Sequence, residues 1–179
     1  MPKTYLVPNV GCPTFETVQL PSPGDAASQG VVRVAEVEEP ADRSQLCESI
    51  LRALPDWFGI EEATAAYIRD VVELPTFAVE DKGFLALKLH TPKAAEVYVM
   101  GVRSENHRQG LGTALLCAAE DYLRERGVEY LQVKTLGPSR PDEGYERTRL
   151  FYEARGFVAL EELHGLWEQN PCLLMVKRL

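Results

Sequence analysis

Two glycines separated by one residue stand between an apolar run and a run of helical character. The segment reads "HRQGLGT", with Gly110 and Gly112 as the glycines and Arg108 just before them. A helix N-terminus has backbone N–H groups without internal partners and the positive end of the helix dipole, so phosphates bind there when no side chain blocks them. The glycines remove those side chains, and Arg108 adds a fixed positive charge. The spacing predicts a pyrophosphate cradle made by the backbone amides from Gln109 to Thr113.

Other interpretations of the glycine pair can be checked against the sequence. A P-loop requires GxxxxGK followed by Ser or Thr, and no such string occurs. A dinucleotide fingerprint requires a small residue three positions after Gly112, where this chain has Leu115. A glycine turn that only lets a helix pack closely on a strand remains the structural alternative for the pair taken alone.

The residues around the glycines resemble the central motif of the GNAT superfamily, the acyl-CoA-dependent N-acyltransferases. That motif is an apolar strand ending in valine, followed by Q/R-x-x-G-x-G/A at the start of a helix. Here the strand is "AEVYVMGV", ending at Val102, and the turn is "HRQGLG", with His107 where the family usually has Gln or Arg. The resemblance implies that acetyl-CoA binds here, mainly through backbone amides. It assigns the following residues to the binding site: Met100, Gly101, Val102, His107, Arg108, Gln109, Gly110, Leu111, Gly112 and Thr113.

A second family motif, N-x-x-A-x-x-L-Y-x-x-x-G-F, resembles "YERTRLFYEARGF". Tyr152, Gly156 and Phe157 match it, whereas Tyr145 stands where the family often has Asn and Thr148 where it has Ala. The resemblance makes Tyr152 the general acid for a leaving thiolate. A phenol with a pKa of ~10 is a reasonable donor for that group. The alternative for Tyr152 is a tyrosine buried in the core.

Acyl transfer to an amine also requires a base and support for the developing oxyanion. Glu96 is the candidate base, because the resemblance places a catalytic glutamate at this strand position in some members. The alternative is an exposed glutamate at the start of a strand. Strand alternation predicts that Glu96, Tyr98 and Met100 face the same side. Gly101 is consistent with a bulge that frees a backbone amide near Met100 for the oxyanion, as the family resemblance implies.

The segment "LPDWFG" lies between the first two predicted helices, at a corner that borders the acceptor site in the family. Trp57 and Phe58 are candidates for the wall of an amine pocket, and Asp56 is a candidate for binding a positive charge. Aromatic residues beside a helix end more often belong only to the core, so both interpretations are kept. The three histidines are far apart in the sequence and show no metal-binding spacing.

The elements that must position these residues follow from hydrophobic periodicity and turn residues. Strands are predicted at 31–37, 76–81, 84–90, 96–102, 129–136, 157–163 and 172–179. Helices are predicted at 42–59, 61–74, 111–126 and 145–155. Asp42 and Gln45 resemble a capping box, and a glycine follows each of the last two helices. The order predicts an α/β fold, with a GNAT-like mixed, mostly antiparallel central sheet and helices on both faces.

The composition fits one domain of 179 residues, with 45% hydrophobic and 26% charged residues. A formal net charge of -8 argues weakly against nucleic-acid or anionic-membrane partners. No apolar run reaches the ~20 residues of a membrane helix, and the start shows no signal-peptide pattern, so we expect a cytoplasmic protein. The four cysteines form no CxxC pair, so we expect reduced thiols and no zinc. Residues 1–30 are interpreted as an N-terminal arm and linker with an ambiguous strand at 15–20, and residues 31–179 as the N-acetyltransferase domain.

The sequence therefore predicts a transferase that moves an acetyl group from acetyl-CoA to a primary amine, without a metal. The alternative is a non-catalytic acyl-CoA-binding or regulatory module on the same fold. A nucleotide-binding protein is a more distant interpretation. The sequence leaves open whether the amine acceptor is a small molecule or a protein, and whether the chain forms a homodimer.

Overall fold

A computed structural model describes residues 3–8 and 30–179 of the chain. Within these residues, eight strands form one sheet in the order β1-β2-β3-β4-β5-β6-β8-β7. All neighbouring strands are antiparallel except β5 and β6, which are parallel. The strands are β1 (Thr4–Pro8), β2 (Val31–Glu36), β3 (Thr76–Val79), β4 (Gly83–Thr91), β5 (Ala94–Val102), β6 (Tyr130–Leu136), β7 (Val158–Trp167) and β8 (Asn170–Arg178).

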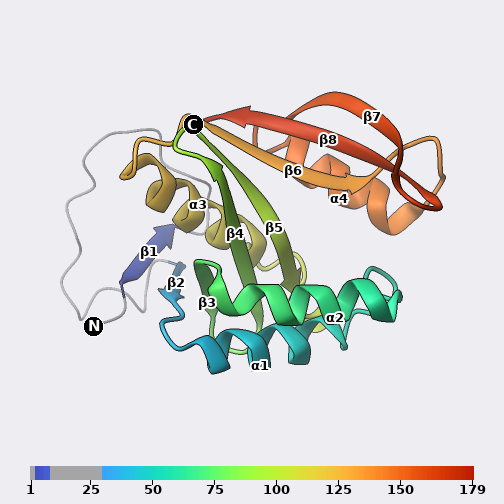
Figure 1. Cartoon of the computed structure of the whole chain (residues 1–179). Helices are drawn as coiled ribbons and strands as arrows, with labels where there is room; N and C mark the ends of the chain where they lie inside the picture. The colour runs from blue at the N-terminus through green and yellow to red at the C-terminus, as the bar shows by residue number, and fades with distance from the viewer. Residues whose placement is uncertain (1–2, 9–29) are drawn as a thin grey trace.

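Helices cover both faces of this sheet (Figure 1). They are α1 (Pro40–Leu51), α2 (Glu61–Asp70), α3 (Leu111–Arg124) and α4 (Glu143–Glu153), with short 3-10 turns at Val71–Glu73 and Ser104–Asn106. One buried cluster packs α3 and Tyr152 of α4 against the sheet, and a second packs α1 on the opposite face. The predicted α/β fold with a mostly antiparallel sheet and helices on both faces is thus confirmed.

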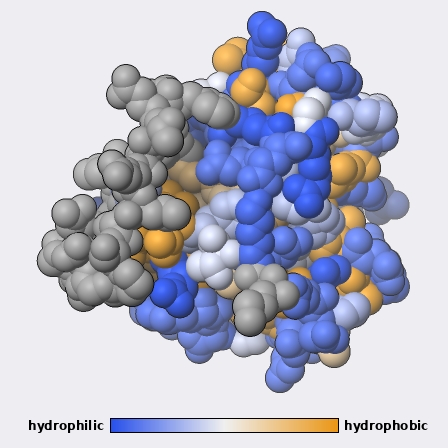
Figure 2. Space-filling model, turned by 90° about the vertical axis from the view of Figure 1, so that its left-hand side faces the viewer, coloured by the Kyte–Doolittle hydropathy of each residue, from blue (hydrophilic) through white to orange (hydrophobic). Residues whose placement is uncertain are grey.

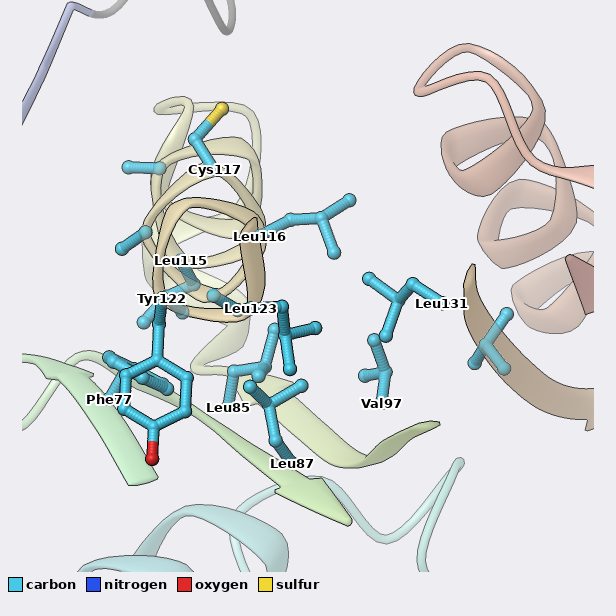
Figure 3. Packing of buried hydrophobic residues seen from close by; sticks show 14 of the residues in the cluster. Phe77, Leu85, Leu87, Val97, Leu115, Leu116, Cys117, Tyr122, Leu123 and Leu131 are labelled. Carbon is cyan, nitrogen blue, oxygen red and sulfur yellow. The ribbon is translucent and has the colours of Figure 1, made fainter. Parts of the chain in front are cut away.

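Helix α3 is anchored by the larger of the two clusters, shown close up in Figure 3. Leu115, Leu116 and Leu123 are completely buried on the helix, and Leu85 and Leu87 of β4 are completely buried beneath them. Fully burying one leucine side chain contributes about 1.5–3 kcal/mol. This packing therefore fixes the N-terminus of α3, where the two glycines lie, relative to the central strands.

The strands β5 and β6 run together at one end and separate at the other (Figure 1). Their pairing covers only Ala94 to Val97 on β5 and Tyr130 to Val133 on β6. Beyond Val97, β5 remains paired with β4 as far as Val102. The last part of β5 therefore has a neighbouring strand on one side only, and an opening lies between it and β6.

A bulge interrupts the alternation of β5 at Tyr98. The register pairs Ala86 with Val99 and Leu87 with Val97, which leaves Tyr98 as an extra residue. Tyr98 consequently packs with the α1 cluster, whereas Met100 packs with the α3 cluster. The prediction that Glu96, Tyr98 and Met100 face the same side is therefore wrong for Met100.

The predicted bulge at Gly101 is also wrong, because Gly101 is in register with Phe84. A glycine is needed at this position for another physical reason. A Cβ atom at this position would lie 2.9 Å from Cγ2 of Ile50 and 3.3 Å from Cδ1 of Leu54. The missing side chain therefore allows α1 and the residues after it to pack closely on β5.

The first predicted helix differs from the structure at both ends. It begins at Pro40 and ends at Leu51, and its N-cap residue Glu39 makes no capping hydrogen bond through its side chain. The predicted capping box is therefore wrong, because Asp42 already lies inside the first turn, where Pro40 occupies a position that suits its fixed φ. The other predicted strands and helices agree with the structure to within a few residues at most ends.

Some features lie outside what the sequence predicted. Strand β1 was not expected; it pairs with β2, and Tyr5 and Val7 enter the core. The ambiguous strand at 15–20 falls outside the described residues. Cys47 and Cys172 are buried free thiols, which agrees with the expectation of reduced thiols for these two residues.

The surface agrees with the charged composition. The face shown in Figure 2 is mostly hydrophilic, with hydrophobic residues in small separate patches. Among the helices of the described part of the chain, none combines the length and the apolar character that crossing a bilayer requires.

Candidate active site

A cavity of about 640 Å³ occupies the opening between β5 and β6. On one face of the sheet its wall is formed by the N-terminus of α3 and by α4. On the other face its wall includes the corner after α1 and side chains of α2 and β5, among them Phe58, Tyr67 and Tyr98. The cavity therefore connects the two faces of the sheet through the gap between its strands.

The predicted phosphate cradle lies in the wall of this cavity. Gly110 is the N-cap of α3 and has a left-handed backbone with φ of 78°, which glycine adopts without strain. The first N–H of the helix with a backbone partner is that of Ala114, which donates to the carbonyl of Gly110 at 3.0 Å. The N–H groups of Leu111, Gly112 and Thr113 come before it and have no acceptor within the helix. These amides are the ones that can bind an anion.

Gly112 is not required by the packing of the protein itself. A Cβ atom at this position would meet only the ring of Phe151, at 3.5 Å, which is an ordinary van der Waals contact. The backbone of Gly112 is helical, so no unusual φ calls for glycine either. The missing side chain therefore keeps the approach to the helix end open, which is the property that a ligand needs.

The loop before α3 holds the cradle against β5. Nε2 of His107 donates to the carbonyl of Val102 at 2.7 Å, and the rings of His107 and Trp57 pack edge to face with their centroids 5.9 Å apart. Arg108 has a positive φ of 61° and lines the cavity. Gln109 instead hydrogen-bonds the carbonyl of Glu105 and does not line the cavity, in contrast to the other nine predicted acetyl-CoA contacts.

Tyr152 lies on α4 and lines the same cavity. Its side chain is only 4% exposed and is held edge-on between the rings of Phe151 and Phe157. Its hydroxyl makes no hydrogen bond with any residue that the structure describes. Burial raises the pKa of Tyr152, so the side chain remains a protonated phenol at neutral pH. The hydroxyl is therefore available as a donor to a group in the cavity.

Glu96 lies beside a second, smaller hollow of about 250 Å³ and does not line the main cavity. Its Oε2 atom accepts hydrogen bonds from Nε2 of His90 at 2.6 Å, from Nζ of Lys134 at 2.8 Å and from Nε2 of Gln132 at 3.1 Å. Burial opposes ionisation of the carboxyl, but the hydrogen bonds from Lys134 and His90 outweigh it. The pKa of Glu96 is therefore lowered, and the group is a carboxylate at neutral pH.

The second hollow adjoins the main cavity. Tyr67, Tyr98, Lys134 and Trp167 line both. The Tyr98 hydroxyl donates to Oδ2 of Asp70 at 2.6 Å, and the rings of Tyr67 and Tyr98 meet edge to face at 5.3 Å. Within the described residues, Oε1 of Glu96 accepts no hydrogen bond. That oxygen therefore retains the capacity to accept a hydrogen bond from a water or a substrate.

The predicted acceptor corner, Asp56 to Phe58, also lines the cavity. The hydroxyl of Tyr145 donates to the carbonyl of Trp57 at 2.8 Å, and Nε1 of Trp57 donates to the hydroxyl of Thr148 at 3.4 Å. Burial raises the pKa of Tyr145 to about 12, which keeps its phenol a donor. Tyr145 and Thr148, which both depart from the second family motif, thus bind this corner to α4.

Sequence reasoning missed several residues of the cavity wall, including Tyr67, Lys134, Thr135 and Trp167. The alternation of β6 indicates that Gln132 and Lys134 share a face. Their meeting with Glu96 depends on the parallel register of β5 and β6, which a local pattern does not reveal. In residues 3–8 and 30–179, no three potential metal ligands of the His, Cys, Asp or Glu type come together.

Comparison with known proteins identifies the class to which this arrangement belongs. The sequence profile of the acetyltransferase (GNAT) domain matches residues 71–159, a range that contains Glu96, the glycine pair and Tyr152. A solved structure of a GNAT-family protein from Desulfovibrio desulfuricans superposes with a TM-score of 0.69, at 20% identity, over 81% of this chain and 97% of that chain. The chain belongs to the GNAT acetyltransferase superfamily, as its motifs predicted.

Two further relatives have specific names. A mycothiol acetyltransferase from Beutenbergia cavernae is 35% identical over 82 residues, which is 45% of this chain and 26% of the relative. The match thus spans about a quarter of that protein's length. An aminoglycoside 6'-N-acetyltransferase, solved in complex with coenzyme A, has a TM-score of 0.62 at 18% identity and covers 81% of this chain and 96% of its own. At that identity, the likeness shows a shared fold.

Proposed function

We propose that this protein is an acetyl-CoA-dependent N-acetyltransferase that moves the acetyl group to a primary amine by direct attack. One observation supports this most strongly. The main cavity crosses the sheet, with an open helix N-terminus on one face and an aromatic region on the other, where the second hollow with Glu96 adjoins it. Such a cavity allows a thioester and an amine to meet from opposite sides. The family relative solved with coenzyme A supports the choice of donor.

On the α3 face, the amides of Leu111, Gly112 and Thr113 and the side chain of Arg108 would bind the pyrophosphate. The pantetheine arm would then extend along the opening toward Met100 and Tyr152. The end of β5 has a neighbouring strand only on the β4 side. A main-chain N–H near Met100 would therefore be available to stabilise the oxyanion that forms on the thioester carbonyl.

The chemical step balances with groups that this chain supplies. The amine nitrogen bonds to the thioester carbon, and the carbon–sulfur bond breaks with its electron pair on sulfur. As the general acid, Tyr152 would transfer its hydroxyl proton to the departing thiolate, so that CoA leaves as a thiol, and the phenolate would regain a proton from water. The proton lost by the amine would pass to Glu96, through water in the second hollow, since Glu96 does not line the main cavity.

The character of the cavity wall indicates the kind of acceptor. Six aromatic side chains surround its acceptor half: Trp57, Phe58, Tyr67, Tyr98, Tyr145 and Trp167. Among the described residues of the main wall, Asp56 is the only acidic one. A single carboxylate in this wall suits an acceptor with one positive charge better than an acceptor with several. We therefore expect an amine with one positive charge and a flat apolar body.

An acceptor screen with mass spectrometry of the products tests this function. The panel would pair arylalkylamines, such as tyramine, with polyamines and aminoglycosides, and free thiol would report acetyl-CoA turnover. We expect acetylation of aromatic amines at a kcat/KM at least about 10-fold above that of polycations, which corresponds to about 1.4 kcal/mol. Acetyl-CoA binding without turnover of any amine would instead favour the non-catalytic acyl-CoA-binding module.

A further inference from the structure

Thr135 of β6 contains a buried hydroxyl for which the described protein offers no hydrogen-bond partner. The residue is only 4% exposed, and it lines the main cavity. Two other buried side-chain atoms of the described residues lack partners, Oη of Tyr5 and Nε of Arg155. Neither of those two residues lines the cavity. Thr135 thus combines an unpartnered polar atom with a place in the cavity wall.

The direction of the Thr135 side chain follows from strand alternation. Strand β6 pairs with β8 without interruption from Tyr130 to Leu136, so its side chains alternate regularly. Leu131 and Val133 pack in the α3 cluster, and Thr135 shares their face. Lys134 points to the opposite face, where it reaches Glu96. The Thr135 hydroxyl therefore lies on the α3 side of the opening, together with Tyr152.

A buried hydroxyl without a partner is unfavourable, since it has lost its hydrogen bonds to water. A ligand that brings a polar group to this position removes the penalty. The pantetheine arm of acetyl-CoA has two amide groups and ends in a thioester carbonyl. The carbonyl oxygen of each of these groups can accept a hydrogen bond from the Thr135 hydroxyl. An amide N–H can also donate a hydrogen bond to the hydroxyl oxygen.

We infer that the Thr135 hydroxyl binds a polar group of the acyl-pantetheine arm and positions it in the opening between β5 and β6. The inference rests on the proposed use of acetyl-CoA and adds a contact that neither family motif contains. It also gives the arm a side-chain partner on β6, whereas Tyr145, at the motif position of the family's Asn, donates its hydroxyl to Trp57.

Thr135→Val tests the inference, because valine has nearly the same shape without the hydroxyl. We expect its affinity for acetyl-CoA, measured by calorimetry, to be about 5- to 20-fold weaker than that of the wild type. The melting temperature of the ligand-free variant should be equal or higher, since an unsatisfied polar group has been removed. Thr135→Ser keeps the hydroxyl and should retain most of the affinity.

Thr76→Val is the matched control. Thr76 is also a buried strand threonine, but its hydroxyl donates to the carbonyl of Leu74 at 2.9 Å, and it does not line the cavity. This variant should melt at a lower temperature and bind acetyl-CoA normally. Thr135→Val is thus expected to weaken acetyl-CoA binding without loss of stability, and Thr76→Val to lower stability without loss of binding.

The ligands also separate the sources of the contact. Equal losses for CoA and acetyl-CoA in Thr135→Val would assign the contact to an amide, and a loss for acetyl-CoA alone would assign it to the thioester carbonyl. Equal affinities of the wild type and Thr135→Val for both ligands would overturn this inference alone. Failure of the wild type to bind either ligand would overturn the proposed function, and this inference with it.

Discussion

Glu96 on β5 and Thr135 on β6 are both buried polar side chains beside the same opening, but the protein satisfies only one of them. Three side chains donate to Oε2 of Glu96, and no described group bonds the hydroxyl of Thr135. The two residues also face opposite sides of the sheet. Glu96 lies on the side of α1 and α2, and Thr135 lies on the side of α3 and α4.

The difference shows how far each half of the site is assembled without ligand. The donors around Glu96 hold it in place as a carboxylate, so the proposed acceptor half is organised by the protein alone. On the other face, the hydroxyls of Thr135 and Tyr152 and the first amides of α3 have no partners from the described protein. A ligand that satisfies these groups would complete this half, which is the behaviour expected of a binding site for an acyl-CoA.

The contrast between the two faces requires that CoA binds on the α3 face, and Gly112→Val tests this requirement. The valine side chain would cover the first amides of α3, so we expect CoA affinity to fall on the order of 100-fold or more and its thermal shift to disappear. The ligand-free protein should remain folded, because the position has room for a Cβ and valine is a better helix former than glycine. A thermal shift equal to that of the wild type would place the cradle elsewhere.

The role of the satisfied carboxylate is tested by Glu96→Gln. If Glu96 removes the proton of the amine, kcat/KM near neutral pH should fall on the order of 10²–10³-fold and recover as pH approaches the pKa of the amine. Acetyl-CoA affinity should hardly change. Overlapping pH profiles for the two proteins would assign Glu96 a structural role and leave Asp56 as the next candidate.

Glu120→Gln provides a matched control for this experiment. Glu120 is completely buried and is paired with Arg124 and Lys177, away from both hollows. The control should lose stability, because a buried ion pair is broken, while its pH–rate profile keeps the wild-type shape. An equal loss of kcat/KM in both variants would show that the effect of Glu96→Gln arises from stability.

The α3 side of the opening contains a second hydroxyl without a partner from the described protein, that of Tyr152. Its removal in Tyr152→Phe should lower kcat about 10- to 100-fold. This is the expected cost of removing one hydrogen bond to a charge that develops only in the transition state. The dissociation constant of acetyl-CoA should stay within about 2-fold, since no other part of the side chain changes. Tyr122→Phe is the control, because Tyr122 lies in the same buried cluster but does not line the cavity. Equal rates for the two variants would assign Tyr152 to packing.

The sequence predicted those parts of the site that depend on local rules. Gly110 and Gly112 could be singled out because a glycine pair at the start of a helix leaves the first amides open, and Tyr152 because its family motif follows at a fixed spacing. The bulge at Tyr98 could not be predicted from the sequence, because it arises from how β4 and β5 align over their full lengths. The group around Glu96 and the position of Thr135 also depend on pairing between segments more than thirty residues apart. The contrast between the two faces is therefore a property of the tertiary structure.

The smallest expected effect concerns the contribution of Glu96 to stability at different pH. The pKa of Glu96 is ordinarily 4.5, and it is lowered in the folded protein because the donors Lys134 and His90 outweigh burial. A lowered pKa means that the unfolded chain binds the proton more readily than the folded protein does. The carboxylate therefore stabilises the fold above pH 4.5, and this contribution is lost as pH falls through the folded pKa.

Glu96→Gln should consequently be less stable than the wild type at pH 7, by about 1–3 kcal/mol for the loss of hydrogen bonds to a charged group. The difference should stay constant down to about pH 5 and become smaller only below pH 4.5, where the wild type begins to take up the proton. Urea unfolding of both proteins from pH 7 to pH 3 measures the difference directly. A difference that already shrinks between pH 7 and pH 5 would show that the pKa of Glu96 is raised. In that case the carboxylate would not be satisfied by its three donors, and the contrast with Thr135 would disappear.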